Sequence, residues 1–228
     1  MINGDRYHGE AITLARLAKE HYVNPHNNLV YETPVGLRHN WSSFGAHAYM
    51  AYAFLTLSKV TGKEWCRHIG IRIARKLVEL QGSEGQWGWM YSMQRGIVVD
   101  FYPIFSVHQY AYAPLFLTAA LDFGYDEFYK PLVKGFRWIF GENEIGESMV
   151  SREHCIVWRN LIRKPPNPKL LKIARGGFIN YLGLKARLER SETLQINREC
   201  WSFEMALPFL VFCGRNDFDE VLNHESFK

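Results

Sequence analysis

The sequence predicts an all-α fold in which helical hairpins are arranged as a ring or an array. The main observation is a segment that occurs twice: residues 47–62 (HAYMAYAFLTLSKVTG) are echoed by residues 108–124 (HQYAYAPLFLTAALDFG). Each copy is an apolar run of helical length that ends in glycine, and a charged pair, an aromatic residue and a second amphipathic run follow it. A third, fainter copy covers residues 203–214 (FEMALPFLVFCG). Because repetition of one supersecondary unit usually sets the architecture, we interpret the unit as a pair of helices.

The helices follow in chain order from apolar spacing and from signals at their ends. Residues 10–22 have apolar positions at helical spacing, and Asn24-Pro25 marks the loop that follows. The three hairpins are expected at 43–61 with 63–81, at 107–123 with 126–140, and at 200–213 with 217–224. Gly62 lies where the C-cap of a helix is wanted. One more helix, broken near Gly176-Gly177, is expected within 168–189.

Long non-helical segments precede the first helix of each hairpin. The largest, 82–105, is rich in glycine and holds the β-like run Ile97-Val98-Val99. Long loops in a compact domain usually carry function. The segments just before the helices, 37–43, 100–109 and 196–200, bring polar and aromatic side chains to helix starts, where backbone N–H groups are free. We therefore expect one shared cleft at that end of the molecule.

Composition limits the class of protein. With 47% hydrophobic and 22% charged residues, the 228-residue chain is an ordinary globular one, so a single domain over 1–228 is expected. The net charge of +4 is modest and no basic and aromatic stripe follows a helix, which argues against nucleic acid. The four cysteines have no close pairing, and neither a signal-peptide pattern nor a membrane-spanning run is visible. A cytoplasmic protein is the expectation.

One short motif points to a known type of fold. Residues 81–87 (QGSEGQW) fit the pattern Q-x3-G-x-W, in which glutamine bonds free backbone groups at a helix end, glycine allows a tight turn and tryptophan packs over it. This pattern resembles the QW motif of squalene and terpenoid cyclases, whose fold is an α/α toroid. The acidic motifs of the two terpene-cyclase classes do not occur in the chain.

A wider resemblance covers about half of the chain. Its segments are GQWGW at 85–89, DFYPIFSVHQ at 100–109, Ala113-Pro114, GFRWIFGENEIG at 135–146 and NRE at 197–199. They resemble little-characterised prokaryotic proteins with a six-hairpin-glycosidase-like toroid that are often associated with polysaccharide biosynthesis. The resemblance implies an all-α toroid and a connection with carbohydrate. Three hairpins and a partial fourth are fewer than a closed ring needs, so a partial toroid, or a homo-oligomer that completes it, is expected.

The candidate catalytic residues are Asp100, Glu199 and His108. Glycoside hydrolysis needs two carboxylates on opposite sides of the scissile bond, and Asp100 and Glu199 both lie in segments that lead into helices. Each could instead cap a helix or pair with an arginine such as Arg198 or Arg159. His108 could act as a general acid or base, or it could fix a turn by bonding a loop carbonyl.

Aromatic and polar residues of the same loops are the candidate substrate-binding residues: Trp41, Trp87, Trp89, Tyr91, Tyr102, Gln109 and Arg198. Aromatic rings at such positions could stack on sugars, or they could close the end of a helical barrel. No metal-binding or cofactor-binding motif is present, so no metal and no cofactor is expected.

The leading hypothesis is a glycosidase-like or lyase-like protein of polysaccharide metabolism that binds a carbohydrate. A terpene-cyclase-like protein that binds or cyclises isoprenoids is the second hypothesis. The third is a protein without catalytic activity that binds glycans or a partner protein. A filled centre without a cleft would favour the third, and an apolar cavity sealed by aromatic rings would favour the second.

Overall fold

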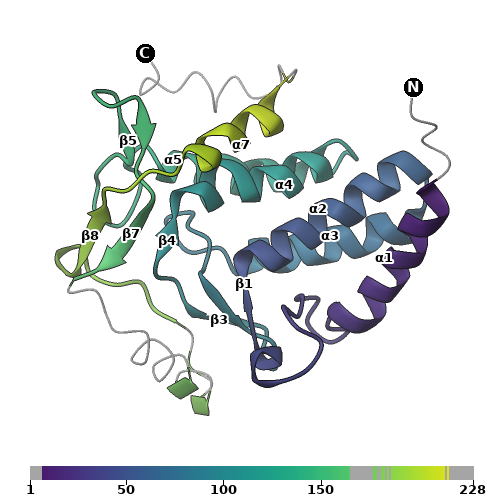
Figure 1. The fold of residues 1–228 in the computed structure, drawn as a ribbon. Helices are drawn as coiled ribbons and strands as arrows, with labels where there is room; N and C mark the ends of the chain where they lie inside the picture. Colours follow the sequence, from purple (N-terminus) through teal and green to yellow (C-terminus); the bar gives the residue numbers. More distant parts are fainter. Residues whose placement is uncertain are drawn as a thin grey trace.

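The computed structural model describes residues 7–164, 177, 178, 181, 182, 184, 186–213 and 215. This part of the chain contains six α-helices and three antiparallel sheets, so the fold is mixed α and β and the prediction of an all-α toroid is wrong (Figure 1). The α-helices are α1 (His8–Tyr22), α2 (Phe44–Thr61), α3 (Glu64–Glu79), α4 (Ala113–Leu121), α5 (Tyr129–Trp138) and α7 (Ser202–Phe212). The short helices are η2 (Leu37–Asn40), η3 (His108–Tyr112), η4 (Asp126–Phe128) and η5 (Ser191–Thr193).

Two helical hairpins are present where the repeat predicted them. The helices α2 and α3 pair along their length, and α4 packs between α2 and α5. Gly62 ends α2 with a left-handed backbone (φ +69°), and its N–H donates to the carbonyl oxygen of Ser58 at 2.8 Å. Only glycine adopts this left-handed backbone conformation without a steric cost, because it has no Cβ. The predicted C-cap is therefore confirmed.

The eight strands form three sheets. They are β1 (Trp41–Ser43), β2 (Met90–Ser92), β3 (Ile97–Asp100), β4 (Ile104–Phe105), β5 (Val150–Ser151), β6 (Ile156–Val157), β7 (Asn160–Arg163) and β8 (Leu194–Asn197). The sheet orders are β1-β2-β3, β4-β7-β8 and β5-β6, and every pair is antiparallel. The strands gather at one end of the helices, on the left and below them in Figure 1.

The segments expected to be loops before the helices contain strands instead. β1 ends at Ser43 and α2 begins at Phe44, β4 lies just before η3, and β8 lies just before α7. Strands of two to four residues are too short to show an alternating pattern, and their partners lie far along the chain. The expectation that these segments lie at one end of the molecule survives, but backbone pairing holds them there.

A continuous hydrophobic core fills the space between the helices and the sheets. Its largest fully buried side chains include Trp87, Trp138, Phe44 and Phe116. Burying one such side chain contributes on the order of 2–3 kcal/mol. Among the described residues the centre is thus filled, and the cavities described below lie at the surface.

The Q-x3-G-x-W segment packs as its residue types predicted. The side-chain amide of Gln81 donates to the carbonyl oxygens of Gly85 at 2.7 Å and of Pro131 at 3.1 Å. Gly85 has φ +92°, and a Cβ added there would lie 2.5 Å from the carbonyl oxygen of Lys134. Trp87 is fully buried and stacks on Phe44. The motif therefore connects the end of α3 to α5.

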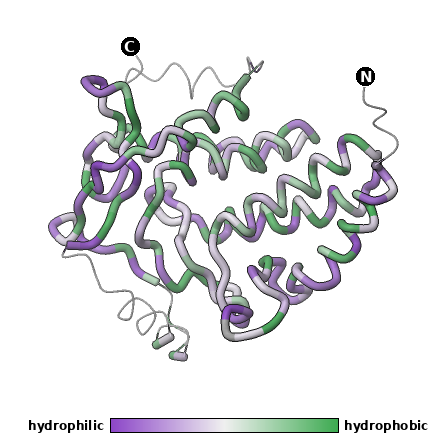
Figure 2. Tube along the Cα trace, in the orientation of Figure 1, coloured by the Kyte–Doolittle hydropathy of each residue, from purple (hydrophilic) through white to green (hydrophobic). Residues whose placement is uncertain are grey.

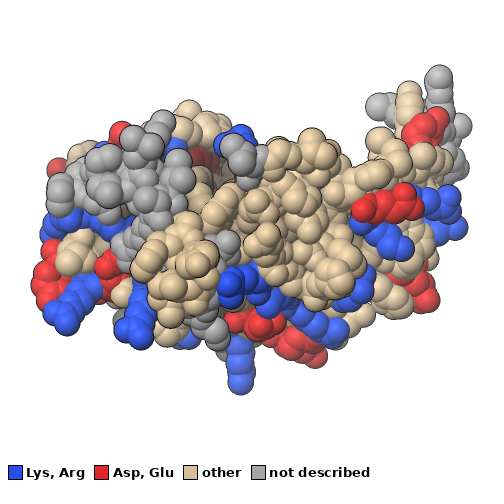
Figure 3. Space-filling view, turned by 90° about the horizontal axis from the view of Figure 1, so that it is seen from below, with Lys and Arg blue, Asp and Glu red and all other residues tan. Residues whose placement is uncertain are grey.

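The surface combines charged and uncharged areas. In the view from below, acidic and basic side chains alternate around a broad uncharged area (Figure 3). The helix α7 is hydrophobic along most of its length (Figure 2), and its Phe209 and Leu210 are 73% and 75% exposed. None of the described helices has both the length and the apolar character to span a bilayer.

Two predicted elements cannot be compared with the structure. The second helix of the third hairpin, at 217–224, lies outside the described residues, as does most of the helix expected within 168–189. The first helix of that hairpin is α7. The single-domain organisation of residues 1–228 stays a prediction.

Candidate functional site

Two of the predicted aromatic residues, Trp41 and Trp89, line the same surface cavity. It has a volume of about 520 Å³, and its lining is Glu32, Arg38, Trp41, Ser42, Ser43, Trp89 and Met90. Antiparallel pairing of β1 with β2 aligns Ser43 with Met90, which brings the two tryptophans to one wall. Both tryptophans are partly exposed. We refer to this space as the Trp41–Trp89 cavity.

His108 lies behind Trp89. The two rings are nearly parallel (10°) with centroids 6.4 Å apart, and three further rings, of Phe44, Phe105 and Tyr112, lie 4.8–5.4 Å from the imidazole. Burial lowers the pKa of His108 to about 3, and its Nδ1 has no hydrogen-bond partner among the described residues. At neutral pH the imidazole is uncharged and holds no transferable extra proton. His108 therefore supports Trp89 and is poorly suited to act as a general acid.

The short helix η3, which begins at His108, is a π-helical turn. Such turns are rare and are often found at functional sites, because the extra residue redirects side chains. Here the turn places His108, Gln109 and Tyr110 in the core. It lies directly after β4 and before α4, at the end of the molecule where the strands gather.

Asp100 is buried and fully paired. Its carboxylate accepts two hydrogen bonds from the guanidinium of Arg163, at 2.6 and 3.2 Å, and a third from the backbone N–H of Tyr102 at 3.1 Å. Arg163 also donates to Glu189 at 2.9 Å. The arginine partner is the alternative that sequence analysis left open for the carboxylates. The backbone oxygen of Asp100 accepts from the N–H of Trp89 at 2.9 Å, so this ion pair fixes the chain next to the Trp41–Trp89 cavity.

Tyr102 belongs to a neighbouring buried network around Glu144. The carboxylate of Glu144 accepts hydrogen bonds from the Tyr102 hydroxyl (3.2 Å), the Trp138 indole (2.7 Å) and the Gln86 amide (3.2 Å). Burial raises the pKa of Glu144, and the hydrogen bonds from its own backbone, from Trp138 and from Tyr102 oppose the shift. The ring of Tyr102 also lies under the guanidinium of Arg163, at 4.8 Å. Tyr102 is thus a structural connection between the two networks.

Glu199 is exposed and pairs with Arg159 at 3.3 Å. The guanidinium of Arg159 lies 3.3 Å from the ring centroid of Trp201 and 3.9 Å from the buried carboxylate of Glu204. Burial raises the pKa of Glu204, and the charge of Arg159 opposes that shift. Arg159 also lies over Phe105, which touches His108. Glu199 and His108 are therefore linked through two side chains, but Glu199 does not line the Trp41–Trp89 cavity.

The remaining predicted residues lie elsewhere. Trp87 and Tyr91 are fully buried, so neither ring is accessible to a ligand in this structure. Gln109 is also fully buried, and its Oε1 has no hydrogen-bond partner among the described residues. Arg198 lines a separate polar groove of about 380 Å³ with Lys164 and residues of η5 and β8. The structure thus brings together Trp41 and Trp89, with His108 behind them.

Sequence analysis missed the two charged residues of the cavity, Glu32 and Arg38. Arg38 lies in the segment 37–43 that was singled out for its position before a helix, so this signal was available. Glu32 lies in the loop after α1, and nothing in its local sequence predicts that it lies beside Trp41.

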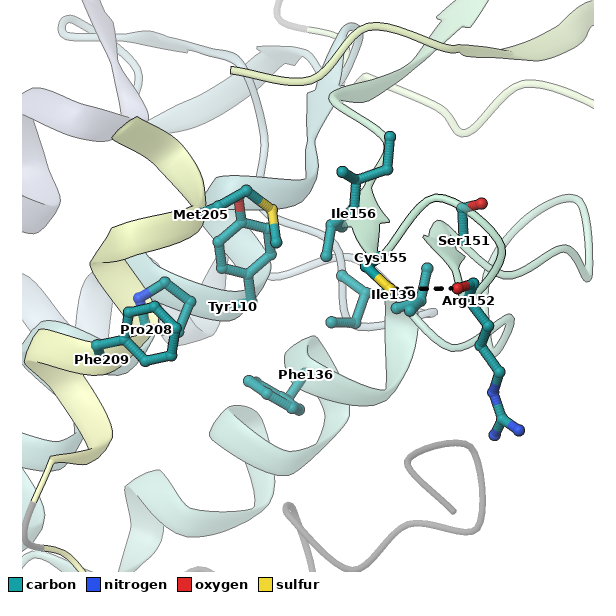
Figure 4. A pocket seen from close by; sticks show the side chains of 12 residues that line it. Tyr110, Phe136, Ile139, Ser151, Arg152, Cys155, Ile156, Met205, Pro208 and Phe209 are labelled. Carbon is teal, nitrogen blue, oxygen red and sulfur yellow. Dashed lines mark hydrogen bonds between the residues drawn. The ribbon is translucent and has the colours of Figure 1, made fainter. Parts of the chain in front are cut away.

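A third cavity, of about 460 Å³, is an apolar groove (Figure 4). In Figure 4 the α7 residues Met205, Pro208 and Phe209 form one side and the β5–β6 hairpin forms the other, with Tyr110 and Phe136 between them. The exposed thiol of Cys155 lies at its margin and donates to the carbonyl oxygen of Arg152.

No family model and no curated protein matches this chain significantly. Among the described residues, no group of three or more histidine, cysteine or acidic side chains is placed to hold a metal ion. The functional conclusion therefore depends on the geometry of the cavities.

Proposed function

We propose that this protein binds a carbohydrate in the Trp41–Trp89 cavity. The observation that carries the proposal is the pair of partly exposed tryptophans on one cavity that also holds a carboxylate, Glu32, and a guanidinium, Arg38. Indole rings stack on the apolar faces of sugar rings. Charged side chains form strong hydrogen bonds with hydroxyl groups. A volume of about 520 Å³ is in the range of small-ligand sites.

The geometry favours binding over hydrolysis or elimination. Glycoside hydrolysis requires two carboxylates across the scissile bond. Of the side chains that line the Trp41–Trp89 cavity, only Glu32 is a carboxylate. Asp100 is held by Arg163 and Glu199 by Arg159. The filled centre of the molecule supports the same choice, since no central cleft is available for a glycosidase-like active site among the described residues.

Two further observations support the metabolic role and the cellular location that we propose. The segments at 85–89, 100–109 and 135–146 resemble proteins associated with polysaccharide biosynthesis, which supports a role in polysaccharide metabolism. All four cysteines are free thiols, as in proteins of a reducing compartment, so we keep the cytoplasm as the proposed location.

Glycan-array screening followed by calorimetric titration tests the proposal. We expect Trp41→Ala to weaken binding of the selected glycan at least tenfold, which corresponds to about 1.4 kcal/mol. The matched control is Trp201→Ala, because Trp201 is 43% exposed but does not line the cavity. Equal affinities of wild type and Trp41→Ala, or no bound glycan, would refute the proposal. If the wild type released reducing sugar from the glycan and the Glu32→Gln variant did not, the proposed function would be catalysis instead of binding.

The apolar groove of Figure 4 supports a second candidate, binding of an isoprenoid chain. Its lining combines the rings of Tyr110, Phe136 and Phe209 with aliphatic side chains, which suits a hydrocarbon ligand. Farnesol, titrated against intrinsic fluorescence, is the probe. We expect saturable binding that Met205→Glu abolishes, since a carboxylate would then face the chain. Non-saturable partition, or equal binding by Met205→Glu, would exclude this candidate.

A further inference from the structure

A further cavity, which shares no lining residue with the Trp41–Trp89 cavity, lies between α1 and α3. Its volume is about 450 Å³. It is lined by basic and aromatic side chains, namely Lys19, Trp65, His68, Arg72, Arg75 and Tyr125. Lys19 comes from the last turn of α1, and Tyr125 directly precedes η4. We refer to it as the α1–α3 groove.

The helical repeat explains why these side chains meet. Trp65, His68, Arg72 and Arg75 are separated by three, four and three positions, so they lie along one face of α3. Other residues of α3, among them Cys66, Ile73 and Leu77, are buried in the core. The amphipathic pattern that packs α3 therefore leaves three basic residues and one tryptophan facing the groove.

The basic groups of α3 divide into two sets. Those with acidic partners are Arg67, paired with Glu64 at 2.9 Å, Lys76, paired with Glu79 at 2.9 Å, and Arg75, paired with Glu127 at 2.8 Å. In contrast, the side chains of His68 and Arg72 on α3 and of Lys19 on α1 make no ion pair or hydrogen bond within the described part of the chain.

The unpaired basic groups are therefore those that line the groove. Like charges that share a concave surface raise its positive potential and attract anions. Arg75, which also lines the groove, is already neutralised by Glu127. The side chains that remain there without an acidic partner among the described residues are Lys19, Arg72 and His68.

The two aromatic rings add a second recognition element. Trp65 is partly exposed and contacts the core through Phe54 (centroids 6.2 Å apart, 69°). Tyr125 is partly exposed and lies under the guanidinium of Arg75, at 5.4 Å. Aromatic side chains bind nucleic-acid bases by stacking on their faces. Lysine and arginine are the usual partners of phosphate.

We propose that the α1–α3 groove binds a nucleoside phosphate, with the phosphate groups between Lys19 and Arg72 and the base against Trp65. The groove is separate from the Trp41–Trp89 cavity and shares no lining residue with it. The proposal is therefore independent of carbohydrate binding. It adds a second, anionic ligand to the same chain.

Calorimetric titration with ADP, pyrophosphate and adenosine tests the site on the whole chain. We expect ADP to bind the wild type most tightly, and the double substitution Lys19→Gln with Arg72→Gln to weaken ADP at least tenfold. The matched control is Arg67→Gln, which removes a cation of the same helix that does not line the groove. Because Lys19 and Arg72 are exposed, the double variant should keep the thermal unfolding midpoint of the wild type.

Each alternative result overturns a stated part of the proposal. No binding of ADP, or equal binding by the double variant, would exclude the site. Equal affinities for ADP and pyrophosphate would remove the role of the aromatic rings. Equal affinities for ADP and adenosine would remove the role of the cations. An affinity for ADP that does not fall as salt rises would contradict the electrostatic origin of binding.

Discussion

Lowering the pH from 7 to 5 should destabilise this protein through two buried histidines. Burial lowers the pKa of both His47 and His108 from 6.5 to about 3. Between these values the unfolded chain binds more protons than the folded one, so stability is complete above about pH 6.5 and falls as the pH approaches 3. For one histidine, the change from pH 7 to 5 lowers the free energy of unfolding by about 2 kcal/mol. Two histidines together lower it by about 4 kcal/mol.

Urea denaturation at pH 5, 6 and 7 measures this change, and two variants assign it. His47 accepts a hydrogen bond from the N–H of Val30 through Nδ1, so His47→Asn keeps an acceptor at that position. His108→Phe keeps a ring among the surrounding aromatic side chains. Each variant should lose about half of the pH dependence. Burial raises the pKa of Glu144 and Glu204, so these two carboxyl groups stabilise the folded state as the pH falls. Their contribution is the same in the wild type and in both variants. An unchanged slope in both variants would refute the assignment.

Three other changes test the structural roles of single residues. Arg163→Met should destabilise the fold by about 3–5 kcal/mol, because Asp100 would be left as a buried charge without its cationic partner. Urea titration of this variant with and without Asp100→Leu checks the expectation, and a double variant no more stable than Arg163→Met would contradict it. Trp87→Ala should cost about 3–5 kcal/mol in chemical denaturation, since Trp87 is fully buried, and a neutral substitution would disprove its packing role. Gly85→Ala should lower the thermal midpoint because the new Cβ would lie 2.5 Å from the backbone of Lys134, and an unchanged midpoint would show that the turn relaxes.

The long helices could be predicted because their signals are local. Apolar residues at helical spacing within 43–81 predict α2 and α3, and Gly62 predicts the end of α2. The strands have no such local signal. β4 is two residues long, Ile104 and Phe105, and it exists because β7 pairs with it. A sequence rule based on periodicity cannot detect an element whose hydrogen bonds come from a distant segment.

In the candidate site, too, some residues were predictable from the local sequence and others depend on distant segments. The loop positions of Trp41 and Trp89 predicted exposure to a ligand, and both line one cavity. Trp87 lies close to Trp89 in sequence and is fully buried, since its ring enters the core against Phe44. Asp100 could not be separated from a catalytic acid by sequence, because its partner Arg163 is brought to it only by the fold.

The central position of β7 has a consequence for the order of folding. In its sheet Ile104 pairs with Leu161 and Leu161 pairs with Ile196, so β7 joins two other segments that are far from it along the chain. Closing such large loops costs conformational entropy before any contact compensates for it, whereas the α2–α3 hairpin closes over a single turn. In pulse-labelling hydrogen exchange, the amides of α2 and α3 should therefore become protected before those of β7. The ion pair between Arg163 of β7 and Asp100, whose backbone oxygen accepts from Trp89, should form only after the helices.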